Sequence, residues 1–266
     1  MAHGSLVVIG TGIKLAAHIT VEARAWIEEA DRVFFLMNGS IVDDWIYTLN
    51  PQAENLARFY ANNKRRLDTY LEMVEHILTA VRQGNRVCAA FYGHPGVFVF
   101  PAHEAIRQAH QEGFSATMLP GISAEDCLFA DLGFDPSYHG CQSYEATDFL
   151  VRPRHFDTST GLILWQIGAV GQLTALNKGE PVRGLPVLVE YLSQHYPANH
   201  MVIIYEAALT PIDEPSIQRV ELQSVMDAVV SPISTMYIPP ITAAAIDPNM
   251  LQRLGLSLET IRWDKR

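Results

Sequence analysis

Short apolar runs alternate along this chain with longer stretches in which hydrophobic residues recur every three or four positions. The short runs have the length and β-branched content of buried strands, and the longer stretches have the period of amphipathic helices. In the first half, the predicted strands cover residues 6–9, 32–36, 86–90 and 114–119, and the predicted helices cover residues 20–30, 68–82 and 102–111. Regular alternation of strands and helices is typical of a mainly parallel sheet, so the pattern predicts an α/β fold.

The second half of the chain is richer in strands, and Pro120-Gly121 marks the predicted boundary before it. We predict strands over residues 161–166, 201–206 and 235–238, helices over 122–131 and 186–195, and a polar loop over 177–184. The predicted organisation is an N-terminal α/β domain over residues 1–119, a C-terminal α/β domain over residues 120–245, and a short tail over residues 246–266.

Composition narrows the classes of function. Hydrophobic residues make up 48% of the 266 positions, enough for a substantial core, and the formal net charge is −10. An acidic chain argues against a partner held through nucleic-acid phosphates. The three cysteines, Cys88, Cys127 and Cys141, have neither zinc nor disulfide spacing, so no metal site is expected. No apolar run has membrane-spanning length and no signal-peptide pattern opens the chain. We therefore expect a cytoplasmic protein without a membrane partner.

The segment 91–98, with the sequence Phe-Tyr-Gly-His-Pro-Gly-Val-Phe, follows a predicted buried strand and breaks regular structure abruptly. The carboxyl end of such a strand is the usual ligand site of an open α/β sheet. The segment lacks the lysine and the Ser or Thr that a phosphate-binding loop requires, so a ligand here is not expected to be held by phosphates. The alternative is a tight connection in which Tyr92 and His94 are only packed.

A second glycine turn, Gly10-Thr11-Gly12, follows the first predicted strand. The dinucleotide-binding fingerprint would require a third glycine at position 15, where this chain has Leu15. Classical NAD binding is therefore not favoured. The turn indicates a place where the backbone must approach another group closely.

Arg66 and Tyr70 are four residues apart, so they share one face of the predicted helix, and Tyr60 lies just before it. A guanidinium near two phenols favours the phenolate form and could make a tyrosine available as a base. The alternative is a solvated basic helix start with tyrosines packed by their rings.

Ser123 lies at the start of the helix that follows Pro120-Gly121. Backbone N–H groups and a hydroxyl at a helix start are suited to bind polar or anionic ligand groups. The same residue could be an ordinary helix cap paired with Asp126, three positions later, and the two interpretations are compatible.

Three of these segments together resemble the tetrapyrrole methylase superfamily: Gly10-Thr11-Gly12, Tyr92-Gly93-His94-Pro95-Gly96 and Pro120-Gly121-Ile122-Ser123-Ala124. Within it, the stretches 64–70, 91–98, 118–135, 144–150 and 234–240 resemble the borosin peptide α-N-methyltransferases, which include omphalotin-type fungal enzymes and split bacterial relatives. The resemblance covers residues 5–260. It implies a two-domain tetrapyrrole-methylase-like fold with S-adenosylmethionine in the cleft between the domains and S-adenosylhomocysteine as product.

The resemblance also implies site residues. The implied cofactor-binding residues are Tyr92, His94, Val97, Phe98, Ser123, Ala124, Gln166, Glu206, Ala207, Ser234 and Thr235. The implied catalytic residues are Tyr60, Arg66, Tyr70 and Tyr92. By this resemblance Tyr70 is the expected base, Arg66 favours its phenolate and holds the substrate amide oxygen, and the other two tyrosines position the reacting groups.

The implied reaction is backbone N-methylation of a ribosomal precursor peptide. Because no apolar peptide repeat follows Pro240 and the chain stops at Arg266, we expect the split arrangement, in which a separate precursor is methylated in trans. An intertwined homodimer with two precursors, a 2:2 assembly, is the implied form. Two other functions remain open: a tetrapyrrole C-methyltransferase, which the segment Ile13-Lys14-Leu15-Ala16 disfavours because it replaces the usual Gly-Asp turn, and a non-catalytic precursor carrier, which would have no need of a base.

Overall fold

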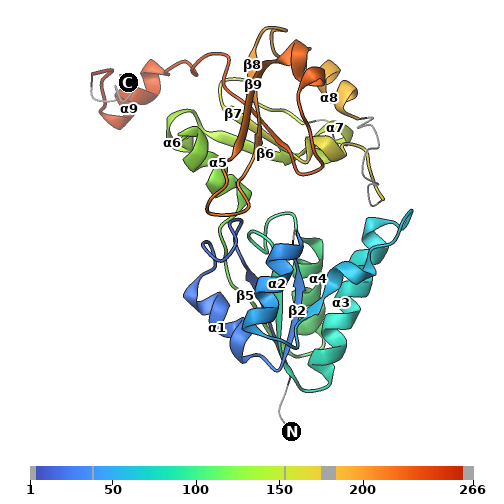
Figure 1. Ribbon diagram of the computed structural model, residues 1–266. Coiled ribbons are helices and arrows are strands. Elements are labelled where there is room, and N and C mark those ends of the chain that lie inside the picture. The colour runs from blue at the N-terminus through green and yellow to red at the C-terminus, as the bar shows by residue number, and fades with distance from the viewer. Residues whose placement is uncertain (1–3, 38, 153, 175–183, 260–266) are drawn as a thin grey trace. The chain divides into compact units, whose positions relative to one another are not determined.

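The computed structural model describes residues 4–37, 39–152, 154–174 and 184–259. The chain forms two compact units (Figure 1). Unit 1 comprises the chain up to Leu132 together with the described residues of two later segments, 173–174 and 207–215. Unit 2 comprises most of the remaining chain, beginning at Gly133.

Unit 1 is built on a five-stranded sheet in the order β3-β2-β4-β1-β5. Its strands are β1 (Ser5–Gly10), β2 (Arg32–Leu36), β3 (Glu54–Asn55), β4 (Arg86–Phe91) and β5 (Ser115–Met118). Every neighbouring pair is parallel, which confirms the predicted mainly parallel sheet. The central strands are buried on both faces, which is the usual condition for parallel strands.

Helices cover both faces of this sheet (Figure 1). One face packs against α1 (Val21–Glu29) and α2 (Ser40–Leu49), and the other against α3 (Arg66–Arg82) and α4 (Phe100–Gln111). The start of α1 is set locally, because the Thr20 hydroxyl accepts a hydrogen bond from the Ala23 N–H at 3.1 Å, as its sequence predicts. The 3₁₀ helix η1 (Leu56–Phe59) precedes α3, and α5 (Ala124–Leu132) follows β5.

Unit 2 contains a mixed five-stranded sheet in the order β6-β7-β10-β8-β9. Its strands are β6 (Cys141–Glu145), β7 (Gly161–Trp165), β8 (Met201–Glu206), β9 (Ser216–Glu221) and β10 (Thr235–Ile238). Only β6 and β7 run parallel. One face of the sheet packs against α7 (Ala146–Val151), α8 (Leu185–Leu192) and η3 (Leu222–Asp227). The remaining elements are α6 (Pro136–His139), η2 (Ile167–Ala169) and α9 (Pro248–Leu254).

The two units do not coincide with the predicted ranges 1–119, 120–245 and 246–266. Helix α5 belongs to unit 1 and ends before Gly133, which has a φ of +64°. Two later segments return to unit 1 through backbone hydrogen bonds: the Leu15 N–H donates to the Leu209 carbonyl at 2.8 Å, and the Arg66 N–H donates to the Leu173 carbonyl at 3.0 Å. Such returns depend on tertiary pairing, so the chain's local composition does not reveal them.

Apart from Gly184, the polar loop predicted over 177–184 lies outside the described residues. Within the described residues, none of the helices combines the length and apolar character needed to cross a lipid bilayer. The same part of the chain contains no group of three or more His, Cys, Asp or Glu side chains arranged to hold a metal ion.

Candidate active site

The turns that follow β1, β4 and β5 meet at glycines. Gly12 and Gly93 exchange two backbone hydrogen bonds, with N···O distances of 3.2 and 3.0 Å. A Cβ atom on Gly10 would lie 2.3 Å from the Gly93 carbonyl oxygen, and one on Gly121 would lie 2.7 Å from the same oxygen. The predicted close backbone approach at the first turn is therefore confirmed, and its partners are the other two turns.

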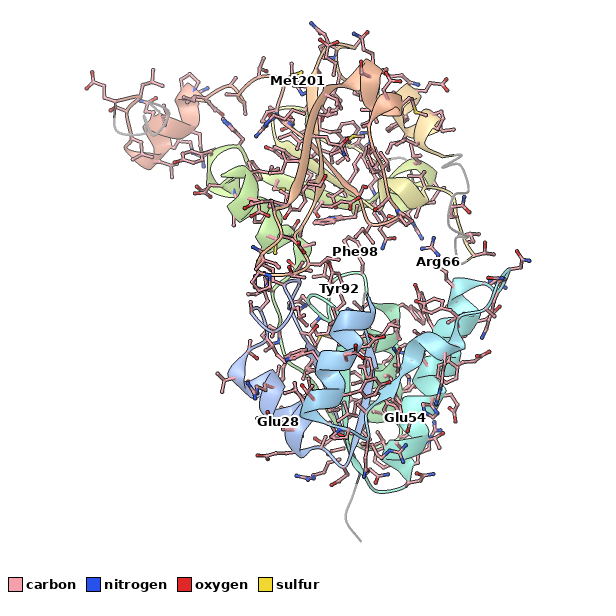
Figure 2. All side chains as sticks on the ribbon, viewed as in Figure 1. Glu28, Glu54, Arg66, Tyr92, Phe98 and Met201 are labelled. Carbon is pink, nitrogen blue, oxygen red and sulfur yellow. The ribbon has the colours of Figure 1, made fainter. Side chains whose placement is uncertain are left out.

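The turn after β4 carries four predicted cofactor-binding residues: Tyr92, His94, Val97 and Phe98. The Nδ1 atom of His94 accepts the Gly96 N–H at 2.9 Å, and its carbonyl accepts the Val97 N–H at 3.0 Å. Phe98 adopts a φ of +56°, and 51% of its surface is exposed. A bulky residue in this left-handed region is strained, and backbone strain is concentrated at functional sites. The turn thus presents apolar surface at the carboxyl end of the sheet (Figure 2).

Ser123 and Ala124 lie at the start of α5. The Ser123 hydroxyl accepts the Asp126 N–H at 3.1 Å, while the Asp126 carboxylate accepts both the N–H and the hydroxyl of Ser123 at 2.7 and 2.6 Å. This reciprocal arrangement is the capping pair that their spacing predicts. Because the cap fixes the helix start, it also fixes where the Pro120-Gly121 turn meets the other two turns.

We expect Ser123→Ala to lower the free energy of unfolding of unit 1 by about 1 kcal/mol, since the helix loses its capping oxygen. Chemical denaturation measures this change. Ser115→Ala, on an exposed position of β5, is the matched control and is expected to change stability by less than about 0.5 kcal/mol. Equal effects from the two substitutions would contradict the capping role.

Four predicted cofactor-binding residues of unit 2 lie at one edge of its sheet. Strand β10 runs antiparallel to β7 and β8, so its amino end meets their carboxyl ends. Gln166 follows β7, Glu206 ends β8, and Ser234 and Thr235 stand where β10 begins. Gln166 has a φ of +58°, a second strained residue among the predicted positions. Ala207 follows directly after Glu206, where the chain returns to unit 1.

Hydrogen bonds join three side chains at this edge. The Glu206 carboxylate accepts the Ser231 hydroxyl at 2.6 Å and also accepts the hydroxyl of Ser234. Ser234 is fully buried, and its carbonyl accepts the Ile167 N–H at 3.0 Å. Glu206 thereby fixes the loop that leads into β10.

We expect Glu206→Ala to destabilise unit 2 by about 1–3 kcal/mol, because the buried Ser234 hydroxyl would lose its charged acceptor. Thermal unfolding measures the loss. Glu190→Ala, on an exposed position of α8, is the control and is expected to lie within about 0.5 kcal/mol of the parent. A parent-like stability for Glu206→Ala would contradict this account.

Three of the four predicted catalytic residues gather where η1 meets α3. The Tyr60 and Tyr70 rings lie edge to face, with centroids 6.5 Å apart, and Tyr70 stacks on Phe100 at 6.2 Å. Arg66 begins α3, and its Nε donates to the Thr174 carbonyl at 3.3 Å. Its place at the amino end of α3 puts it at the carboxyl end of the sheet, the end that also bears the glycine turns (Figure 2).

The surroundings of Tyr60 change its pKa. Burial raises the pKa of Tyr60, and the charge interaction and hydrogen bond with Tyr70 raise it further. The positive charge of Arg66 lowers this pKa, but by less. The Tyr60 side chain is nevertheless 37% exposed. Tyr60 is therefore a neutral phenol near pH 7, suited to donate or orient a hydrogen bond rather than to remove a proton.

Tyr92, the fourth predicted catalytic residue, is the first residue after β4. Its N–H donates to the Leu36 carbonyl at 3.1 Å. Its side chain lines a pocket with the turn over residues 11–16 and with Val42 and Trp45 of α2. The sequence analysis did not predict α2, so it did not identify Val42 and Trp45 as pocket residues.

Sequence reasoning also missed three residues that contact the predicted site: Phe100, Thr174 and Ser231. Phe100 continues the aromatic segment that begins at Phe91, so its sequence carries a weak signal. Ser231 is three residues before Ser234 in a turn. The backbone acceptor at Thr174 has no sequence signal, because any residue could supply its carbonyl.

The fold and the glycine turns define the class of this protein. The family model described as "Tetrapyrrole (Corrin/Porphyrin) Methylases" matches residues 5–224, and the chain belongs to this family. Among curated proteins, it is 41% identical over 95% of its length to the "Methyltransferase/ribosomally synthesized cyclic peptide omphalotin A precursor" of Omphalotus olearius, of which it covers 62%. It is 43% identical, also over 95% of its length, to a type III borosin cyclic peptide precursor of Anomoporia bombycina, of which it covers 30%.

The chain thus spans about three fifths or less of these relatives, and they confirm the resemblance to the borosin group. Solved structures agree on the fold. The uroporphyrin-III-C-methyltransferase of Thermus thermophilus matches 95% of this chain and 96% of its own, with a TM-score of 0.63 and 15% identity. A cobalt precorrin-4 methyltransferase matches 89% of this chain and 95% of its own, with a TM-score of 0.65 and 18% identity. The predicted two-domain tetrapyrrole-methylase-like fold is confirmed.

Proposed function

We propose that this chain is an S-adenosylmethionine-dependent methyltransferase that methylates backbone amide nitrogens of a ribosomal precursor peptide supplied as a separate chain. The cluster of Tyr60, Arg66 and Tyr70 is the observation that carries the proposal. A tetrapyrrole methyltransferase, which transfers the methyl group to a carbon of a macrocycle, does not account for this group of two phenols and a guanidinium. A protein that only binds a precursor does not account for it either. Relatives about 40% identical are described as methyltransferases joined to ribosomal peptide precursors, which supports the same choice.

The chemistry explains why such a cluster is needed. A peptide nitrogen is a poor nucleophile because its lone pair is delocalised into the carbonyl. When bound, S-adenosylmethionine supplies a methyl group on a positively charged sulfur. The Tyr70 oxygen, as phenolate, takes up the amide proton and becomes a phenol, and the Arg66 guanidinium stabilises the negative charge that develops on the amide oxygen. The amide nitrogen would then bond to the methyl carbon as the bond between that carbon and sulfur breaks, and S-adenosylhomocysteine would leave. Tyr60 remains a phenol and orients Tyr70, while Tyr92 positions the acceptor near the end of β4.

The described residues suit an adenosine and a methionine group. Unit 1 offers the apolar side chains of Val97 and Phe98 and the polar turn at His94. Unit 2 offers the carboxylate and hydroxyl edge around Glu206. Sites for such molecules combine apolar walls with a few placed polar groups. We assign cofactor binding to the residues that the resemblance implies: Tyr92, His94, Val97, Phe98, Ser123, Ala124, Gln166, Glu206, Ala207, Ser234 and Thr235.

We further propose that the enzyme works in the cytoplasm as an intertwined homodimer that binds two precursor peptides. The relatives' names support a precursor as the partner. Sedimentation analysis of the chain with and without the identified peptide tests the stoichiometry. A monomer that methylates its peptide at the full rate would contradict the dimer.

The test of the function is to incubate the purified chain with methyl-labelled S-adenosylmethionine and a peptide extract of the producing cell. Fragmentation mass spectrometry then locates the label. We expect label on a backbone nitrogen of one small protein. Label on a macrocyclic pigment would replace the proposal with a tetrapyrrole methyltransferase, and cofactor binding without any transfer would favour a precursor carrier.

A further inference from the structure

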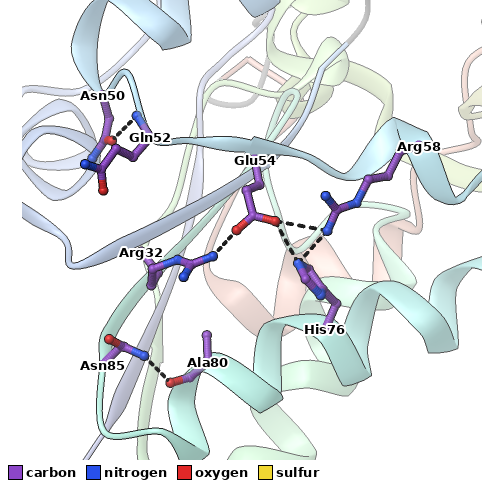
Figure 3. A network of polar contacts seen from close by, with 8 residues as sticks. All are labelled: Arg32, Asn50, Gln52, Glu54, Arg58, His76, Ala80 and Asn85. Carbon is purple, nitrogen blue, oxygen red and sulfur yellow. Dashed lines mark hydrogen bonds and ion pairs between the residues drawn. The ribbon is translucent and has the colours of Figure 1, made fainter.

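A single carboxylate contacts side chains from three elements of unit 1, β2, η1 and α3 (Figure 3). Glu54 of β3 accepts a hydrogen bond from Arg32 of β2, and its Oε2 lies 3.0 Å from both Arg58 Nη2 of η1 and His76 Nε2 of α3. Burial would raise the pKa of Glu54, but the hydrogen bonds from His76 and Arg32 hold it below its ordinary value. Glu54 is therefore charged near neutral pH and fully engaged by cations and donors.

The His76 side chain also packs against aromatic rings of β2 and η1. Its ring lies 4.9 Å from the Phe34 ring in β2 and 5.4 Å from the Phe59 ring in η1. The Arg58 guanidinium lies 5.2 Å from the same Phe59 ring. The polar contact and the ring contacts together attach η1 to α3. We call Glu54, Arg58 and His76 the Glu54 tie.

A second attachment lies on the other side of Tyr60. Lys64 Nζ donates to the Phe59 carbonyl at 2.9 Å and to Glu72 Oε2 at 2.5 Å, and its side chain is only 22% exposed. The turn between Tyr60 and α3 includes Asn63, with a φ of +60°. We call this contact set of Lys64, Phe59 and Glu72 the Lys64 tie. Tyr60 therefore lies between two points at which its segment is attached to the helix that carries Tyr70.

We propose that the two ties position Tyr60 against Tyr70, and that Glu54, His76 and Lys64 are positioning residues for proton removal from the substrate amide. The inference rests on the proposed function. Tyr60 is the extended residue that follows η1 and is more than one third exposed, so its place relative to Tyr70 depends on how its segment is attached. A misplacement of about 1 Å at a reacting group can cost about 100-fold in rate.

The test compares His76→Leu, which keeps side-chain bulk and removes the donor, with His76→Gln, which keeps a donor. We expect His76→Leu to lower kcat about 10- to 100-fold while the KM for S-adenosylmethionine stays within about twofold, and His76→Gln to recover most of the loss. Lys64→Gln is a second, independent variant and is expected to act in the same direction. Arg82→Gln is the matched control, because Arg82 pairs with Glu75 and Glu112 at the opposite end of α3.

A spectroscopic readout separates this inference from the proposed function. With 3-fluorotyrosine incorporated, the ¹⁹F resonance of Tyr60, assigned by Tyr60→Phe, reports its surroundings in the free protein. We expect the resonance to shift in His76→Leu and Lys64→Gln and to stay in place in Arg82→Gln. An unmoved resonance with parent kcat, or an equal kcat loss in Arg82→Gln, would overturn the positioning role. Absence of any methyl transfer would contradict the proposed function alone, since a shifted resonance would still support the ties.

Discussion

Tyr70→Phe and Arg66→Ala are expected to lower kcat for peptide methylation about 100- to 10,000-fold, the range for loss of a general base or of a charge-stabilising donor. Tyr70→Phe removes the oxygen that we propose as acceptor of the amide proton and leaves the ring stacked on Phe100. Arg66→Ala removes the cation whose charge acts on the Tyr60 phenol. Single-turnover kinetics with the labelled cofactor and the identified peptide measure both losses.

Cofactor affinity is expected to stay within about threefold in both variants, since neither residue is assigned to cofactor binding. Calorimetric titration with S-adenosylhomocysteine checks this. Tyr138→Phe, on the exposed helix α6, is the matched control for loss of a phenol and is expected to keep the parent rate. Parent-like rates in Tyr70→Phe and Arg66→Ala with cofactor binding intact would remove the catalytic assignment.

Arg66 requires one more comparison, because its Nε also donates to the Thr174 carbonyl. Arg66→Lys keeps the charge but loses the planar group of donors. If charge alone matters, this variant keeps a large part of the rate. If the guanidinium geometry matters, it resembles Arg66→Ala. The two variants together separate stabilisation of the developing charge from attachment of the segment at residues 173–174.

Local signals in the sequence predicted the parts of the fold that depend on neighbouring residues. The Thr20 cap and the pairing of Ser123 with Asp126 form over a few positions, and the structure has both. Strand β3 was not predicted, because its two residues become a strand only by pairing with Phe34 and Phe35. Residues 207–215 return to unit 1 through contacts with residues far away in the sequence, so the local sequence does not predict this return either.

In the candidate site, too, the sequence predicted the features that depend on neighbouring residues and not those that depend on tertiary contacts. The spacing of Arg66 and Tyr70 predicted that they share a helix, and both lie in α3. The net effect on the pKa of Tyr60 could not be read from spacing, since burial and Tyr70 outweigh the nearby cation. Similarly, the sequence indicated that Gly10 must approach something closely, but only the sheet order identifies Gly93 and Gly121 as its partners.

Gly10→Ala is expected to lower the free energy of unfolding of unit 1 by about 3 kcal/mol or more, because the neighbouring turns leave no room for a side chain there. The added Cβ would lie 2.3 Å from the Gly93 carbonyl oxygen and 2.7 Å from Pro95 Cδ. A backbone oxygen held by its own hydrogen bond cannot move aside as a flexible side chain could. The three turns would have to separate, so the turn at His94 to Phe98, to which we assign cofactor binding, would be displaced as well.

Gly113→Ala provides the control. Its φ of +83° carries an intrinsic cost of about 1–2 kcal/mol for a residue with a side chain, but a Cβ there would meet nothing within 4 Å. Urea denaturation is expected to give a larger loss for Gly10→Ala than for Gly113→Ala, and only Gly10→Ala should weaken cofactor binding at a temperature where both variants are folded. Equal stability losses with unchanged cofactor affinity would mean that the meeting of the three turns does not shape the site.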